Sequence, residues 1–121
     1  MTLLNQEPGY EKVKSLLNEA SKSQGHILMN EVSLGEVYYS IAKGRSLADA
    51  ERILPELLRL PIEFIPASLN LIISAAKIKA RYPISYIDCF VVALAQSHGA
   101  RIITGDSGFR VLEDLVEIEW I

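Results

Sequence analysis

The 121-residue sequence contains a single cysteine, Cys89, so it cannot form an internal disulfide. Small secreted domains that depend on disulfides are therefore excluded, and nothing indicates an oxidising compartment. Half of the residues are hydrophobic, which is enough for a chain of this length to bury its own core. No repeat or linker interrupts the chain, so the sequence predicts a single domain over residues 1–121.

Long apolar runs and an excess of positive charge are also missing. No stretch approaches the roughly 20 apolar residues of a membrane-spanning helix, so we expect a cytoplasmic protein without a membrane partner. Twelve Lys and Arg face 15 Asp and Glu, giving a net charge of −3. This balance disfavours passive coating of nucleic acid. It allows an acidic site whose bound cation reverses the local charge.

Glycine is scattered, and neither a phosphate-binding glycine loop nor a Gly-x-Ser-x-Gly motif is present. Helical and extended patterns instead alternate along the chain. Strands separated by helices predict an α/β fold with a mainly parallel sheet. Strands are expected at 26–29, 62–65, 101–105 and 116–121. Helices are expected near 13–20 and 31–43, and at 68–81 and 85–98. A further helix is expected to begin after Ser46 and to break at Pro55.

Three acids, Glu36, Asp88 and Asp106, each have a simple structural explanation. Glu36 follows Ser33 and Asp88 follows Ser85 at the spacing of a helix capping box. Asp106 begins Asp-Ser-Gly, a common turn sequence after a strand. Taken one at a time, none of the three acids requires a function.

Considered together, the three acids indicate a metal site. Each follows a strand or opens a helix, so all can face the same end of a parallel sheet, where such folds bind ligands. Asp88 also opens an apolar helix, where an unpaired carboxylate is costly. Carboxylates without nearby His or Cys suit Mg²⁺ or Mn²⁺. A metal in such a cluster supports hydrolysis of a phosphodiester.

Two long segments resemble a known family. "LMNEVSLGEVYYSIAKGR" and "SYIDCFVVALAQSHGARIITGD", followed by Phe109, are similar to the PIN domain, and within it to VapC-type toxins of toxin–antitoxin pairs. The resemblance implies a three-layer α/β/α fold and a Mg²⁺-dependent (or Mn²⁺-dependent) endoribonuclease that acts on RNA. It also implies a homodimer and a cognate antitoxin that holds the enzyme inactive.

Positions in this sequence that match the motifs of the family receive their roles from the resemblance. Glu36, Asp88 and Asp106 would be the metal-binding acids. Thr104, two residues before the last acid, would orient the site.

The start of the sequence departs from the family pattern. PIN domains open with a strand that ends in a first catalytic Asp, whereas here the chain opens "MTLLNQEPGYEKV" and its first aspartate is Asp49. We therefore expect an N-terminally truncated domain with weakened metal binding, whose unpaired sheet edges favour a homodimer. The alternative is a catalytically inactive PIN-like module that binds an antitoxin or dimerises. A phosphohydrolase of the aspartyl-phosphate type has the least support, because it needs an early Asp.

Overall fold

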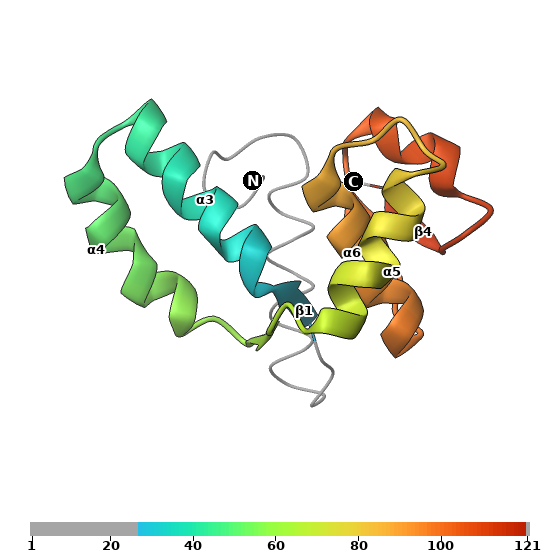
Figure 1. Cartoon of the computed structure of the whole chain (residues 1–121). Coiled ribbons are helices and arrows are strands. Elements are labelled where there is room, and N and C mark those ends of the chain that lie inside the picture. The colour runs from blue at the N-terminus through green and yellow to red at the C-terminus, as the bar shows by residue number, and fades with distance from the viewer. Residues whose placement is uncertain (1–26, 121) are drawn as a thin grey trace. The chain divides into compact units, whose positions relative to one another are not determined.

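The computed structural model describes residues 27–120 and divides the chain into two compact units, Met1–Ile65 and Pro66–Ile121 (Figure 1). The helix expected near 13–20 and the segment in which a first strand was sought lie outside the described residues. Within the part that is described, no helix combines the length and the apolar character needed to cross a membrane.

Among the described residues, 27–65 of the first unit form two parallel strands and a pair of helices. Strand β1 (Ile27–Asn30) leads into α3 (Glu31–Gly44), and α4 (Leu47–Leu58) leads to β2 (Ile62–Ile65). The strands pair in parallel with Ile27 opposite Ile62. Helices α3 and α4 lie side by side (Figure 1). Their contact buries apolar residues from both helices, namely Val37, Ile53 and Leu57, with Leu34, Ile41 and Leu60 packed against them.

Asn30 joins the strand pair to α3 and is a fully buried polar residue, only 1% exposed. Its Oδ1 accepts a hydrogen bond from the Val32 N–H at 2.8 Å, which caps the helix, and its Nδ2 donates to the Ile65 carbonyl at 3.3 Å. The predicted capping box from Ser33 to Glu36 is therefore wrong. The helix begins earlier because Asn30 already provides the cap.

Pro55 does not break α4, contrary to expectation. The helix runs unbroken from Leu47 to Leu58, with the predicted cap Ser46 accepting from the Asp49 N–H at 3.0 Å. Proline lacks the N–H that would bond the Glu51 carbonyl. Glu51 is exposed, so water can satisfy that carbonyl. Burial of Ile53 and Leu57 on either side of the proline holds the helix together.

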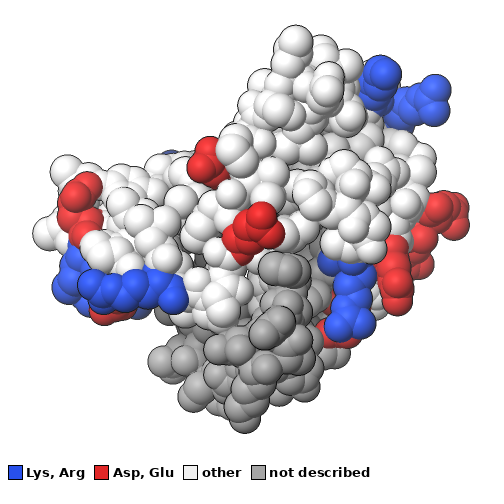
Figure 2. Space-filling view, turned by 90° about the horizontal axis from the view of Figure 1, so that it is seen from below, with Lys and Arg blue, Asp and Glu red and all other residues white. Residues whose placement is uncertain are grey.

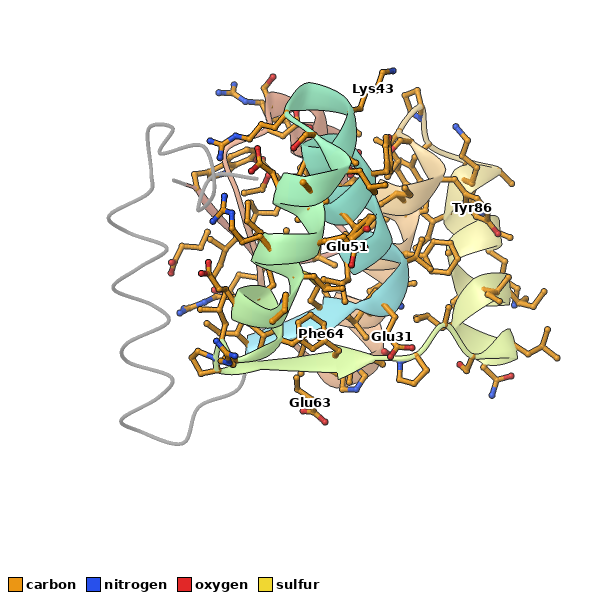
Figure 3. The ribbon with its side chains drawn as sticks, turned by 90° about the vertical axis from the view of Figure 1, so that its left-hand side faces the viewer. Glu31, Lys43, Glu51, Glu63, Phe64 and Tyr86 are labelled. Carbon is orange, nitrogen blue, oxygen red and sulfur yellow. The ribbon has the colours of Figure 1, made fainter. Side chains whose placement is uncertain are left out.

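A side-chain hydrogen bond links the two helices of the first unit. The Tyr38 hydroxyl on α3 donates to Oε1 of Glu51 on α4, and Figure 3 shows Glu51 on the side of α4 that faces α3. This bond, more than the negative charge of Glu51, raises the pKa of Tyr38 above its ordinary value. Tyr38 therefore stays protonated at neutral pH and remains a donor.

The second unit also contains a pair of helices and two parallel strands, but here both helices precede the strands. It contains α5 (Leu69–Lys79), α6 (Tyr86–His98), β3 (Ile102–Thr104), the 3₁₀ helix η1 (Ser107–Leu112) and β4 (Ile118–Trp120). Ser68 and Ser85 cap the two helices, and Gly99 ends α6 in the left-handed conformation with φ 59°. Strands β3 and β4 pair in parallel. The predicted α/β fold class with parallel strands is confirmed.

Helix α6 forms the core of the second unit, as its apolar sequence predicted. It is buried along most of its length, and α5 packs against it. The buried residues of this unit are Leu71, Ala75, Ile78, Ile84, Cys89, Phe90, Val92, Ala93, Leu94, Ala95, Ile102, Phe109, Leu112 and Val116.

We predict that Asn30→Ala lowers the free energy of unfolding by about 2–3 kcal/mol, because it removes a helix cap and a buried hydrogen bond together. Asn30→Ser keeps a cap acceptor but cannot reach the Ile65 carbonyl, so its loss should be smaller. Ser46→Ala removes only an exposed cap and should cost about 1 kcal/mol. Urea unfolding followed by circular dichroism measures all three. Equal losses for Asn30→Ala and Ser46→Ala would show that the bond to Ile65 contributes nothing.

Candidate metal centre

Asp88 lies in the first turn of α6, as the sequence predicted. Its backbone N–H donates to Ser85 Oγ at 3.2 Å, which is one half of a capping box. The other half would be a bond from the Ser85 N–H to the Asp88 carboxylate, and the structure lacks it. Among the described residues no donor reaches this half-buried carboxylate. Capping therefore explains Ser85 and leaves the Asp88 side chain available for a ligand.

Asp106 is positioned by its neighbours on both sides. Its N–H donates to the Thr104 hydroxyl at 3.0 Å, and its Oδ1 accepts from the Gly108 N–H at 2.9 Å. The turn explanation is therefore correct for Oδ1, which caps η1. Oδ2 receives no hydrogen bond from the described residues, and the side chain is exposed. One carboxylate can thus serve the turn and still offer an oxygen to a cation.

The order of α6 and β3 along the chain places Asp88 and Asp106 toward the same end of the second unit. Helix α6 contacts β3, and only three residues separate His98 from Ile102, so the strand runs back along the helix. The first turn of α6 is then at the end where β3 finishes, two residues before Asp106. Thr104 lies at this end as well. The path of the chain therefore favours a common edge for Asp88, Thr104 and Asp106, and their convergence on one ligand stays a prediction.

Glu36 lies elsewhere in the chain. It is the sixth residue of α3, in the first unit, and not in the first turn that the sequence predicted. Its side chain is half-buried. Within residues 27–120, no three His, Cys, Asp or Glu side chains are grouped as a metal site. The convergence of Glu36 with Asp88 and Asp106 therefore stays a prediction.

The chemistry of the available atoms at this edge fits a hard cation. Asp88 and Asp106 offer carboxylate oxygens, which are the ligands that Mg²⁺ and Mn²⁺ prefer. Cys89, the neighbour of Asp88, is 0% exposed. Burial raises the pKa of its thiol, and the Asp88 charge adds to that effect against the opposing charge of Lys79. A protonated, buried thiol does not bind zinc.

The family model of the PIN domain matches residues 1–115. The chain belongs to the PIN domain family. PIN domains are typically metal-dependent nucleases. No curated protein matches the sequence significantly.

Solved structures of two toxin–antitoxin complexes contain chains with the same fold. One is VapBC2 from Rickettsia felis, bound to a DNA fragment from its promoter, with 18% identity and a TM-score of 0.72. The other is DNA-bound VapBC from Salmonella typhimurium, with 17% identity and a TM-score of 0.73. Each match covers 98% of this chain and 89% or 88% of the other. At such low identity the likeness establishes the PIN fold alone.

The expected N-terminal truncation finds no support in these comparisons. The PIN family model matches from residue 1, and the solved chains are covered almost completely. Residues 1–26 lie outside the described part. The lack of the family's first catalytic Asp is therefore seen in the sequence pattern alone.

Two features of the structure were not predicted from the sequence, the buried cap Asn30 and the contact of Arg110 with Trp120. Asn30 directly precedes α3. Its position at the end of a predicted strand was the signal that could have identified it as the cap. An added Cβ at Gly35 would meet no atom within 4 Å, so this glycine allows no close approach to α3. The contact of Arg110 with the Trp120 ring has no local signal in the sequence, because nine residues separate the two.

Gly108 provides a test of how Asp106 is held. A Cβ at this position would lie 3.2 Å from Asp106 Oδ1, so the carboxylate would have to shift. We predict that Gly108→Ala weakens Mn²⁺ binding severalfold in calorimetry while the protein stays folded.

The matched control is Gly35→Ala, which adds the same methyl group next to Glu36 in open space. It should leave Mn²⁺ affinity unchanged and raise the free energy of unfolding by about 0.5–1 kcal/mol, because alanine favours the helix. Equal Mn²⁺ affinities for the two variants would contradict a role of Asp106 geometry in metal binding.

Proposed function

We propose that this PIN domain is a Mg²⁺-dependent (or Mn²⁺-dependent) endoribonuclease of the VapC toxin type. The observation that supports it best is the pair Asp88 and Asp106, two carboxylates at one edge of the second unit. Each keeps an oxygen that no described residue bonds. Membership of a family of nucleases agrees with this chemistry. We propose that residues 1–121 form a single domain.

Asp88 and Asp106 would hold the cation, and Glu36 would add a third carboxylate. The bound cation would neutralise the phosphodiester charge and lower the pKa of a water molecule. Thr104 fixes the backbone of Asp106, and Gly108 fixes its Oδ1, so the free Oδ2 keeps one direction. Ser85 fixes the backbone of Asp88 in the same way. The Asp106 carboxylate therefore loses little freedom when a cation binds.

Partners follow from the solved relatives, which were crystallised as VapBC complexes. We propose that this chain binds a cognate antitoxin and forms a homodimer. A second candidate function is an inactive PIN-like module that retains these contacts without catalysis. The observation that favours it is the lack of a three-acid group within the described residues.

Cleavage of RNA separates the two functions. We predict that the purified chain cleaves bulk transfer RNA or a mixed-sequence single-stranded RNA with Mg²⁺ and stops when EDTA is added. Asp88→Asn and Asp106→Asn should lower the rate roughly a hundredfold or more, because even the outer partners of metal ligands cost 10–100-fold. Asparagine at position 106 can still cap η1 through its side-chain oxygen, so the fold should survive.

Asp114→Asn is the matched control, since it removes an exposed carboxylate of the same unit outside the proposed centre. Its rate should stay within about twofold of the wild type. Cleavage that persists in EDTA, or that falls equally in all three variants, would refute the metal centre. A folded wild-type chain that cleaves neither RNA would support the inactive module.

A further inference from the structure

The second unit carries an arginine held against an aromatic ring next to the proposed metal centre. The guanidinium carbon of Arg110, on η1, lies 5.8 Å from the centre of the Trp120 ring on β4. A guanidinium over an indole face is attracted to it, and its in-plane N–H groups still point outward. The arrangement therefore orients the donors of Arg110 without using them.

Arg110 and Trp120 lie at the same edge as Asp106. Trp120 is the register partner of Thr104 in the parallel pair of β3 and β4, so the two side chains share a face of the sheet. Thr104 in turn accepts the hydrogen bond of the Asp106 N–H. Arg110 follows Asp106 by one turn of η1. The carboxylate, the ring and the guanidinium thus come from one short stretch of chain.

The positive charge of Arg110 is available to bind an anion, unlike the charge of Arg101 in the same unit. Arg101, the residue directly before β3, forms an ion pair with Glu119 at 3.4 Å. Among the residues that the structure describes, no carboxylate lies within ion-pair distance of Arg110, and its side chain is exposed. On the face seen in Figure 2, acidic and basic side chains form small separate groups. An anion approaching this acidic chain would therefore depend on individual cations.

We propose that Arg110 binds a phosphate of single-stranded RNA next to the acids, and that Trp120 is the positioning residue that holds it there. The proposal rests on the proposed nuclease function and adds a substrate contact to it. Arginine beside an aromatic ring suits single strands, whose backbone and bases are both accessible. A phosphate held by Arg110 would place the neighbouring phosphodiester near Asp106.

Binding can be measured without cleavage. Fluorescence anisotropy with a fluorescein-labelled oligouridylate in EDTA reports affinity at several salt concentrations. We predict that Arg110→Ala weakens binding about tenfold, as expected for a lost hydrogen bond to a charged group. The slope of log affinity against log salt should fall by about 0.7, the value for one phosphate of a single strand.

Arg101→Ala is the matched control, because it removes the same charge from the same unit at a residue already paired with Glu119. Its affinity and salt slope should stay close to wild type. Trp120→Leu should weaken RNA binding and leave the slope of log affinity against log salt unchanged. The Arg110 charge remains in this variant, but no ring holds the guanidinium in place. Trp120→Phe keeps a ring and should restore binding. With Mg²⁺, Arg110→Ala should raise KM and leave kcat within about twofold.

Several outcomes would overturn the proposal. One is equal RNA affinity of Arg110→Ala and Arg101→Ala, which would make the ring contact purely structural. Another is a wild-type chain that binds no oligouridylate. A third is Trp120→Phe binding as weakly as Trp120→Leu. A wild type that binds RNA through Arg110 yet cleaves none would refute the nuclease and leave the phosphate contact intact.

Discussion

In both units, a side-chain oxygen caps the helix that follows a parallel strand, and the fold depends on this cap. At the last residue of a strand the backbone must turn into a helix, and the first N–H groups of that helix lack partners. Asn30 solves this problem after β1, and Asp106 solves it after β3, each through a side-chain oxygen. Asn30 also bonds the neighbouring strand through Nδ2 and is buried. Asp106 is exposed, and its second oxygen remains for other chemistry.

This difference in burial separates a structural role from a functional one. The amide of Asn30 is neutral, so it can be buried once both of its polar groups are bonded. A carboxylate in the same place would carry its charge out of water at a high cost. Asp106 stays at the surface, where Thr104 and Gly108 hold it. The same local turn thus yields a rigid core in one unit and a candidate ligand in the other.

The sequence predicted the parts of the fold that are governed by local chemistry. The caps Ser46 and Ser85 and the end of α6 at Gly99 follow from preferences of single residues, and all three were found as expected. Predictions from local sequence preferences were wrong where tertiary packing determined the start or the continuity of a helix. Asn30 displaced Ser33 as the cap of α3, and buried side chains carried α4 through Pro55. The Arg110–Trp120 contact joins η1 to β4 and could not be seen in a linear pattern. Of the site residues, the positions of Asp88, Thr104 and Asp106 relative to their elements could be predicted, because each adjoins a cap or a strand end.

The lengths of chain between paired strands bear on how the two units fold. In the first unit, paired residues such as Asn30 and Ile65 are separated by 35 positions. The separation between β3 and β4 is less than half of that. Each doubling of a closed loop costs about 0.6 kcal/mol of chain entropy. Pairing of β3 with β4 therefore has a modest entropic advantage, and the edge that carries Thr104 and Asp106 can form before the strand pair of the first unit closes.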